Sequence, residues 1–177
     1  VVSNARPTYS NSEGIRIMNT HNVTLGTGNI ASIDQMTIDA GGTLTLGAGT
    51  SFTVNDGAGT DLTVDGTLYN GNLAGVNTFV GTTQFNATGL YNHAFTGGLI
   101  PTAIWIAGSE CRITGPMASA PSGLGQAFSD FTWNTSTQTA SLNLSSGLTN
   151  VGRDLNIVNT NSFTLGFSVF DEKDYFT

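Results

Sequence analysis

The sequence predicts an all-β fold, a right-handed parallel β-helix of short strands joined by tight turns. Apolar–Thr–apolar triplets recur between glycines, and glycine supplies 23 of the 177 residues. The triplets advance by eight residues from Met36 to Leu44 to Phe52 and by ten to Leu62. No window of eleven or more residues carries a helical apolar period. The triplets are Val23-Thr24-Leu25, Met36-Thr37-Ile38, Leu44-Thr45-Leu46, Phe52-Thr53-Val54, Leu62-Thr63-Val64, Phe131-Thr132-Trp133 and Phe163-Thr164-Leu165.

Each triplet is predicted to form a short strand with two apolar side chains on one face and the threonine on the other. The strand rhythm begins at Ile15 and is clearest over 36–68, where Asp, Asn and Gly clusters supply turns. Three strand-and-turn units make a coil of about 24 residues, so Leu62-Thr63-Val64 should stack on Met36-Thr37-Ile38, and Gln84-Phe85-Asn86 one coil further on.

Later coils are predicted to continue this stack and to enclose one apolar column. Their strands are Ile104-Trp105-Ile106, Arg112-Ile113, Phe131-Thr132-Trp133, Leu142-Asn143-Leu144, Leu155-Asn156-Ile157 and Phe163-Thr164-Leu165. Residues 116–130 contain Pro121, Gly123 and Gly125, which indicate an ordered loop or one helical turn.

An antiparallel β-sandwich is the alternative fold, because strands spaced by 8–12 residues also suit it. Such short strands would make poor sandwich sheets, which favours the β-helix. We expect an irregular N-terminal segment over 1–14, a β-helical domain over 15–166 and a C-terminal tail or linker over 167–177. The two ends of the sequence suggest a processed protein or an excerpt from a longer chain.

The charge and composition of the chain argue against nucleic-acid binding and against a membrane-spanning helix. The formal net charge is −7, and the five basic residues are one lysine and four scattered arginines. Without a basic patch, nucleic-acid binding is not expected. No stretch approaches the ~18 apolar residues of a membrane-spanning helix. Cys111 is the only cysteine, so it cannot form an intrachain disulfide, and it is expected to be a small buried hydrophobe.

One turn bears on metal binding, because 56–62 resembles a single copy of a calcium-binding nonapeptide. Asp56 stands where that repeat has its first glycine, and Leu62 follows Asp61 directly. We therefore expect an ordinary polar turn and no cofactor. An adventitious calcium ion held by Asp56, Asp61 and Asp65 is the alternative.

The sequence offers little catalytic machinery, and we expect a protein that is not an enzyme. Sugar-cleaving β-helices place two carboxylates on neighbouring coils, about 5 Å apart for retention and about 6.5–9.5 Å for inversion. The candidates Asp34, Asp39, Asp61 and Asp65 stand in turns, where Asp is favoured for local hydrogen bonding. His21 and His93 have no cysteine or carboxylate at metal-ligand spacing.

Two surface functions remain to be weighed. The only candidates for a binding face are Tyr91, His93, Trp105 and Trp133, for which core packing is the other interpretation. Ice binding needs threonines stacked on one flat side. Thr37 and Thr63 can stack, but Thr45 and Thr53 are expected on other sides, which disfavours it.

An ordered set of motifs over 91–157 resembles a module of large secreted surface proteins that are exported by the type IX secretion route. The Gly-Gly-Thr-Leu-Thr-Leu run at 41–46 is similar to the β-helical stretch that leads into this module. The motifs are Tyr91-Asn92-His93, Gly97-Gly98-x-Ile100-Pro101-Thr102-Ala103-x-Trp105, Gly108-Ser109-x-Cys111-x-Ile113-Thr114-Gly115, Pro121-Ser122-Gly123-Leu124-x-Gln126-x-Phe128, Phe131-Thr132-Trp133-Asn134 and Gln138-Thr139.

The resemblance covers about residues 20–165, and such proteins are often adhesins or gliding-associated filaments. It implies an extracellular, cell-surface location, with surface polysaccharide or other copies of the same protein as partners. Members often carry a second cysteine just after the Trp-Asn pair, where this chain has Thr135, so no pairing partner for Cys111 is implied.

Together these observations predict a non-enzymatic structural or adhesive module of an extracellular bacterial surface protein, acting as a rigid stalk or adhesion segment. The alternative is a β-helical domain that binds or cleaves polysaccharide as a lyase or hydrolase. Cleavage predicts a groove in which two or more carboxylates, or a Lys or Arg base, converge within ~10 Å.

Overall fold

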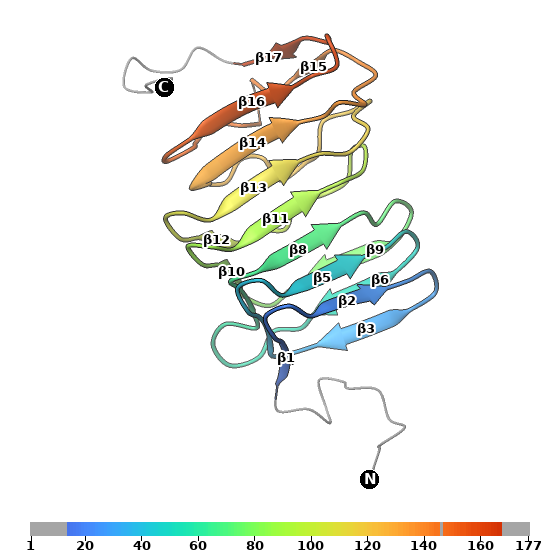
Figure 1. The fold of residues 1–177 in the computed structure, drawn as a ribbon, viewed down its shortest axis with the longest axis vertical. Helices are drawn as coiled ribbons and strands as arrows, with labels where there is room; N and C mark the ends of the chain where they lie inside the picture. The colour runs from blue at the N-terminus through green and yellow to red at the C-terminus, as the bar shows by residue number, and fades with distance from the viewer. Residues whose placement is uncertain (1–13, 146, 168–177) are drawn as a thin grey trace.

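A computed structural model describes residues 14–145 and 147–167 of the chain. The backbone coils into a β-solenoid in which every strand pair is parallel, as the ribbon in Figure 1 shows. The predicted all-β parallel β-helix is thus confirmed over the described residues, and the antiparallel sandwich is not formed. The predicted segments 1–14 and 167–177 lie outside the described residues except for Gly14 and Phe167.

The largest wall is a seven-stranded sheet that takes one strand from each coil. Figure 1 shows it rising from β2 near the N-terminal end to β16 near the C-terminal end. Its strands in spatial order are β2 (Asn22–Leu25), β5 (Thr43–Leu46), β8 (Thr67–Asn70), β11 (Leu90–His93), β13 (Glu110–Ile113), β14 (Asp130–Asn134) and β16 (Leu155–Asn159).

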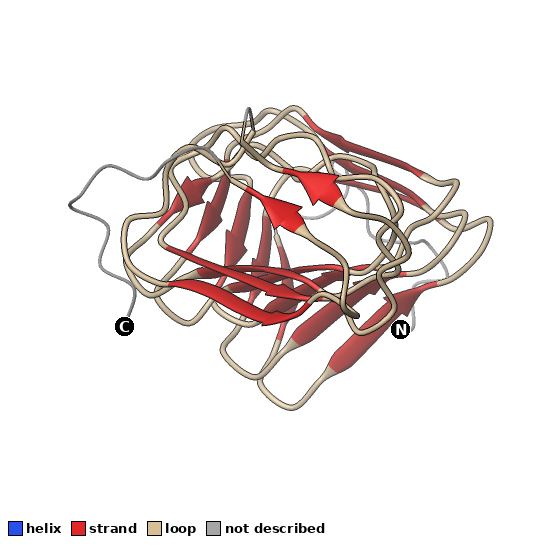
Figure 2. Cartoon of the chain, turned by 90° about the horizontal axis from the view of Figure 1, so that it is seen from above, coloured by secondary structure: helices blue, strands red, loops and turns tan. Residues whose placement is uncertain are grey.

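Three smaller sheets complete the walls, and Figure 2 looks along the stack, with strands on the walls and loops between them. The five-stranded sheet contains β1 (Ile15–Ile17), β4 (Met36–Ile38), β7 (Leu62–Val64), β10 (Thr83–Phe85) and β12 (Ile104–Trp105). The three-stranded sheet contains β3 (Ile30–Ile33), β6 (Ser51–Val54) and β9 (Val76–Phe79), and the two-stranded sheet contains β15 (Leu142–Asn143) and β17 (Leu165–Gly166).

The strand register agrees with the predicted stacking. Met36 pairs with Leu62 and Ile38 with Val64, and Val64 in turn pairs with Phe85. Coil length varies: Gln84 pairs with Ile104, 20 positions on, whereas Met36 and Leu62 are 26 positions apart. Because the strands stay in register while the coils differ in length, the extra residues of the longer coils lie in the turns.

The core is a column of inward side chains, since alternate residues of a strand face opposite sides. In the seven-stranded sheet one inward row is Leu44, Leu68, Tyr91, Cys111 and Phe131, each at most 1% exposed. Burying an apolar side chain of this size stabilises the fold by about 1.5–3 kcal/mol. Burial also raises the pKa of the Cys111 thiol well above its ordinary value, which fits the predicted inert role.

The two end coils bury their inward side chains less completely. Val23, which pairs with Leu44, is 41% exposed, and Ile157, which pairs with Trp133, is 43% exposed. Among the described residues these side chains have a neighbouring coil on one side only, so the column is tightest in the middle of the stack.

Glycine permits close approach of coils at the corners. A Cβ added at Gly66 would lie 2.3 Å from the carbonyl oxygens of Asp39 and Gly42, on the coil before it. The backbone of this corner therefore has no room for a side chain.

Loops replace strands on one wall of the later coils. Residues 116–129 contain no helical turn; this segment is held by a bridge between Leu99 and Ser122 and by the buried side chains of Met117, Leu124 and Phe128. The described residues contain no helix that is long and apolar enough to cross a membrane.

Candidate functional site

A polar groove lies on the outer face of the seven-stranded sheet, across β13, β14 and β16. Its volume is about 360 Å³. Its floor and walls consist of Glu110, Arg112, Asp130, Thr132, Asn134, Asp154, Asn156 and Val158. The groove brings three acids and an arginine together on one face of the sheet.

A repeated tetrapeptide builds the groove, with the order acid, apolar, polar, apolar. It occurs as Glu110-Cys111-Arg112-Ile113, Asp130-Phe131-Thr132-Trp133 and Asp154-Leu155-Asn156-Ile157. Because Glu110 pairs with Asp130 and Phe131 pairs with Leu155, the three acids stand on successive coils, whose strands are ~4.8 Å apart. These three acids are not among the residues predicted from the sequence, although their repeat at steps of 20 and 24 residues is a signal for them.

The Glu110 carboxylate is held by a two-point ion pair with Arg112. The guanidinium donates from Nε to Oε1 at 2.9 Å and from Nη2 to Oε2 at 2.6 Å. Partial burial by itself raises the pKa of Glu110, but hydrogen bonds from Arg112 and the Thr132 hydroxyl and the charge of Arg112 outweigh it, so that the pKa is lowered. Glu110 is thus a stable carboxylate near neutral pH.

The next acid is also compensated. Asp130 Oδ1 lies 3.4 Å from Arg153 Nε and accepts a hydrogen bond from the Ser129 hydroxyl at 3.5 Å. Arg153 Nη2 lies 3.9 Å from Asp154 Oδ2, and the Asp154 side chain is 55% exposed. Three acids are therefore matched by two arginines at this end of the sheet, and Asp154 is the acid most open to solvent.

A β-bulge lies at one end of the groove. The register shifts after Trp133, so that Asn134 pairs with Asn159 and Val158 is the extra residue. Bulges bend a strand and redirect its side chains, and they are enriched at sheet edges and beside binding sites. Asn134 and Asn156 are exposed, and within the described part of the chain their side-chain amides make no hydrogen bond.

The groove offers hydrogen-bond donors and acceptors together with carboxylates. Glycoside hydrolysis needs one carboxyl group with a raised pKa to protonate the leaving group. The pKa of Glu110 is lowered, which does not suit Glu110 to that role. The Glu110 carboxylate is therefore better suited to accepting hydrogen bonds than to donating a proton.

The predicted aromatic residues face the interior. Tyr91, His93 and Trp133 are 0% exposed, and Trp105 is partly buried with its ring stacked on Phe85 at 4.4 Å and an interplanar angle of 6°. These rings pack in the core, which was the other interpretation of them, and three of the four cannot touch an external ligand.

Tyr91 and His93 belong to a buried hydrogen-bond chain. Asn70 Nδ2 donates to the Tyr91 hydroxyl at 2.9 Å, that hydroxyl lies 3.3 Å from His93 Nδ1, and His93 Nε2 lies 2.7 Å from the Gly97 carbonyl oxygen. A neutral ring with the proton on Nε2 satisfies both contacts of the imidazole. Burial lowers the pKa of His93 and raises that of Tyr91.

The same chain continues into the coil before it. Asn70 Oδ1 accepts from Asn77 Nδ2, and Asn72 joins Asn77 to the backbone of Thr50. This network crosses the level of β9, where the three-stranded sheet ends. Side chains thus connect neighbouring coils where the backbone ladder of that wall stops, and the role of Tyr91 and His93 is structural.

Both tryptophans satisfy their indole N–H with a glutamine. Trp105 Nε1 donates to Gln126 Oε1 at 3.1 Å, and Trp133 Nε1 donates to Gln138 Oε1 at 2.9 Å. Buried indole groups need such partners. Gln138 is fully buried, whereas Gln126 is half-buried.

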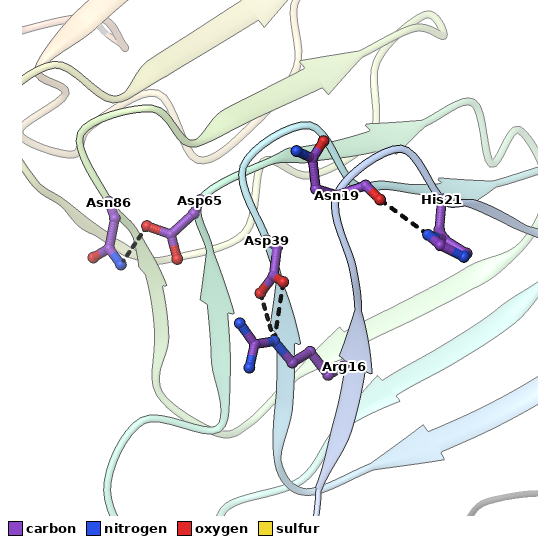
Figure 3. A network of polar contacts seen from close by, with 6 residues as sticks. All are labelled: Arg16, Asn19, His21, Asp39, Asp65 and Asn86. Carbon is purple, nitrogen blue, oxygen red and sulfur yellow. Dashed lines mark hydrogen bonds and ion pairs between the residues drawn. The ribbon is translucent and has the colours of Figure 1, made fainter.

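Two of the three carboxylates suggested for calcium are engaged by the protein. Asp61 is buried and accepts from the backbone N–H groups of Gly57 and Thr82, while Asp65 accepts from Asn86 at 2.9 Å (Figure 3). Asp56 is exposed. No group of three or more His, Cys, Asp or Glu side chains suited to a metal ion occurs in the described residues.

Asp39 and His21 also have local roles, whereas Asp34 Oδ1 is buried and has no hydrogen-bond partner among the described residues. Figure 3 shows Asp39 accepting two bonds from Arg16 Nε, at 2.8 and 3.0 Å, and His21 Nδ1 at 3.0 Å from the Asn19 carbonyl oxygen. Asp39 and Asp65 follow neighbouring strands, β4 and β7, yet each binds a different partner. Each of these two carboxylates is thus held by a partner of its own.

Comparisons with known proteins add no assignment, because no family model, curated protein or solved structure matches the chain.

Proposed function

We propose that this chain is a rigid, non-enzymatic structural and adhesive module of an extracellular bacterial surface protein. The observation that carries the proposal is the seven-stranded parallel sheet, which continues through the described coils over an apolar column that is fully buried in the middle of the stack. In solenoids each coil is held by its neighbours along the whole stack, which makes the stack stiff. The resemblance to surface proteins exported by the type IX route supports the location.

The charge state of the groove supports a role without catalysis. Glu110 and Asp130 each have an arginine partner, and neither arginine is free to act as a base. Surface polysaccharide and further copies of the protein remain the proposed partners.

Two measurements on the whole chain test this proposal. Pulled between its ends by force spectroscopy, the chain should show no lengthening until coils unfold, and soft extension at low force would contradict a stalk. Incubated with a polysaccharide panel, it should release no new reducing ends and no unsaturated sugars. Product release at a rate proportional to protein concentration would refute the non-enzymatic assignment.

Polysaccharide cleavage is the second candidate, because the groove does place acids on neighbouring coils beside Arg112. The ~4.8 Å spacing of strands is close to the ~5 Å separation of carboxyl groups in retaining enzymes. If product release is seen, Glu110→Gln and Asp130→Asn should each abolish it, whereas Asp39→Asn on another wall should not.

A further inference from the structure

We propose that the groove over β13, β14 and β16 binds a segment of an uncharged polysaccharide that lies across three successive coils. This inference rests on the proposed adhesive function and specifies its site and ligand class. The site combines a concave surface, a mixed set of donors and acceptors, and two exposed amides that have no hydrogen-bond partner among the described residues.

The shape of the groove suits a chain rather than a compact ligand. Its lining residues come from three strands in spatial succession, so the groove runs across the strands along the coil stack. The bulge after Trp133 bends the last of these strands at one end. A polymer crossing the coils would meet one similar set of polar groups about every 4.8 Å.

The polar groups suit sugar hydroxyls, which both donate and accept. Asn134 and Asn156 each offer an amide with two donor hydrogens and an acceptor oxygen. Arg112 uses Nε and Nη2 for Glu110, and among the described residues Nη1 has no hydrogen-bond partner. The paired carboxylates retain acceptor capacity, since each ionised carboxylate has about four lone-pair sites.

The charges indicate an uncharged polymer. Both arginines near the groove are paired with acids, so no free cation is available to a uronate or sulfate group. Asp154 leaves the groove slightly acidic, and the chain as a whole has a net charge of −7, which repels polyanions. A cationic amino-sugar polymer is the competing ligand that the experiment must exclude.

The groove is open, so binding at one site should be weak, with a Kd of about 0.1–1 mM. Repeated copies on a surface would raise the avidity by factors of about 10²–10⁴ without new contacts. Weak single sites are thus compatible with adhesion.

Affinity electrophoresis and calorimetry of the whole chain test this site. The probes are soluble uncharged polymers (xyloglucan, mannan, dextran), alginate as the polyanion and chitosan as the polycation. We expect at least one uncharged polymer to bind, with affinity unchanged between 0.05 and 0.5 M salt, and alginate not to bind. The double variant Asn134→Ala/Asn156→Ala should bind at least ~10-fold more weakly, because two hydrogen-bonding amides are lost.

The matched control is Asn22→Ala, which removes an exposed asparagine from β2 of the same sheet, far along the stack from the groove. It should bind like the parent chain, and circular dichroism should show all three proteins folded. Absence of binding to every uncharged polymer, equal binding by the double variant, or salt-sensitive binding to chitosan alone would each overturn this site. None of those results affects stiffness or lack of cleavage, so the proposed stalk function is judged separately.

Discussion

Arg112 binds the carboxylate of Glu110 through two N–H···O bonds, although a single residue separates them in the chain. Residues i and i+2 of a strand lie on the same face, and strand β13 therefore places both side chains outside while Cys111 and Ile113 fill the core. A short stretch of sequence thus fixes the charge state of the groove.

Glu110→Gln should lower the free energy of unfolding at pH 7 by about 0.5–1 kcal/mol, the range of partly exposed ion pairs. The pKa of Glu110 is lowered in the fold from its ordinary value of 4.5. The stabilisation is therefore present above pH 4.5 and is lost as the pH falls through the lower folded value. Urea titrations of parent and variant should converge toward pH 3, and a constant difference down to that pH would contradict the assignment.

His93 predicts a second, separate pH dependence. Burial lowers the pKa of His93 from its ordinary value of 6.5, so the unfolded state takes up the proton first. The free energy of unfolding should decrease as the pH falls below 6.5, by at most about 1.4 kcal/mol per pH unit. His93→Gln keeps a donor for the Gly97 carbonyl oxygen and should remove this slope between pH 6.5 and 5.

His21→Gln is the control for that experiment. His21 is also a histidine, but it is exposed in a turn before β2. The variant should keep the slope of the parent chain. Equal slopes in all three proteins would show that the buried imidazole does not titrate with unfolding.

Gln138→Leu should destabilise the fold by about 3 kcal/mol. Gln138 Oε1 accepts from Trp133 Nε1 at 2.9 Å and from the Thr135 hydroxyl at 2.8 Å, in a site where all three residues are 0% exposed. Leucine leaves the Trp133 indole N–H without an acceptor and removes the bond from Gln138 Nε2 to the Ala140 carbonyl oxygen, while the Thr135 hydroxyl keeps only the Asn159 carbonyl oxygen at 3.3 Å. Each buried polar group left without its partner costs about 1–3 kcal/mol. Thr137→Val, an exposed change in the same turn, should stay within about 0.5 kcal/mol of the parent. Equal urea midpoints for the two variants would contradict this role of Gln138.

The regular part of the stack was predictable because its turns are short and nearly equal. Steps of eight to ten residues between Met36 and Leu62 specify three walls, and the observed pairing of Met36 with Leu62 follows from them. The later coils were less predictable, because loops such as 116–129 replace strands on one wall and their packing depends on distant residues. The sequence pattern carries no information on those contacts.

The candidate site was predicted less well for two physical reasons. The predicted acids lie in turns, whereas Glu110 and Asp130 are the first residues of their strands. These two acids are 20 positions apart in the sequence, and only the pairing of their strands brings them together. In a strand with polar residues on both faces, such as β11, the sequence pattern also does not show which face of the strand points into the core. His93 can be buried because Tyr91 of the same strand and the Gly97 carbonyl oxygen of the following loop satisfy its ring nitrogens.

Gly66→Ala should destabilise the solenoid by about 1–3 kcal/mol, the usual cost of overpacking. Its added Cβ would lie 2.3 Å from two carbonyl oxygens of the coil before it, and backbone cannot yield as a flexible side chain does. Gly26→Ala is the matched control, since the nearest atom to its Cβ would be 3.6 Å away, an ordinary contact. The control should unfold at or slightly above the parent temperature, because alanine reduces the freedom of the unfolded chain. If Gly66→Ala loses stability and Gly26→Ala does not, the close approach of neighbouring coils, and not the flexibility of the turn, is the reason that position 66 needs glycine.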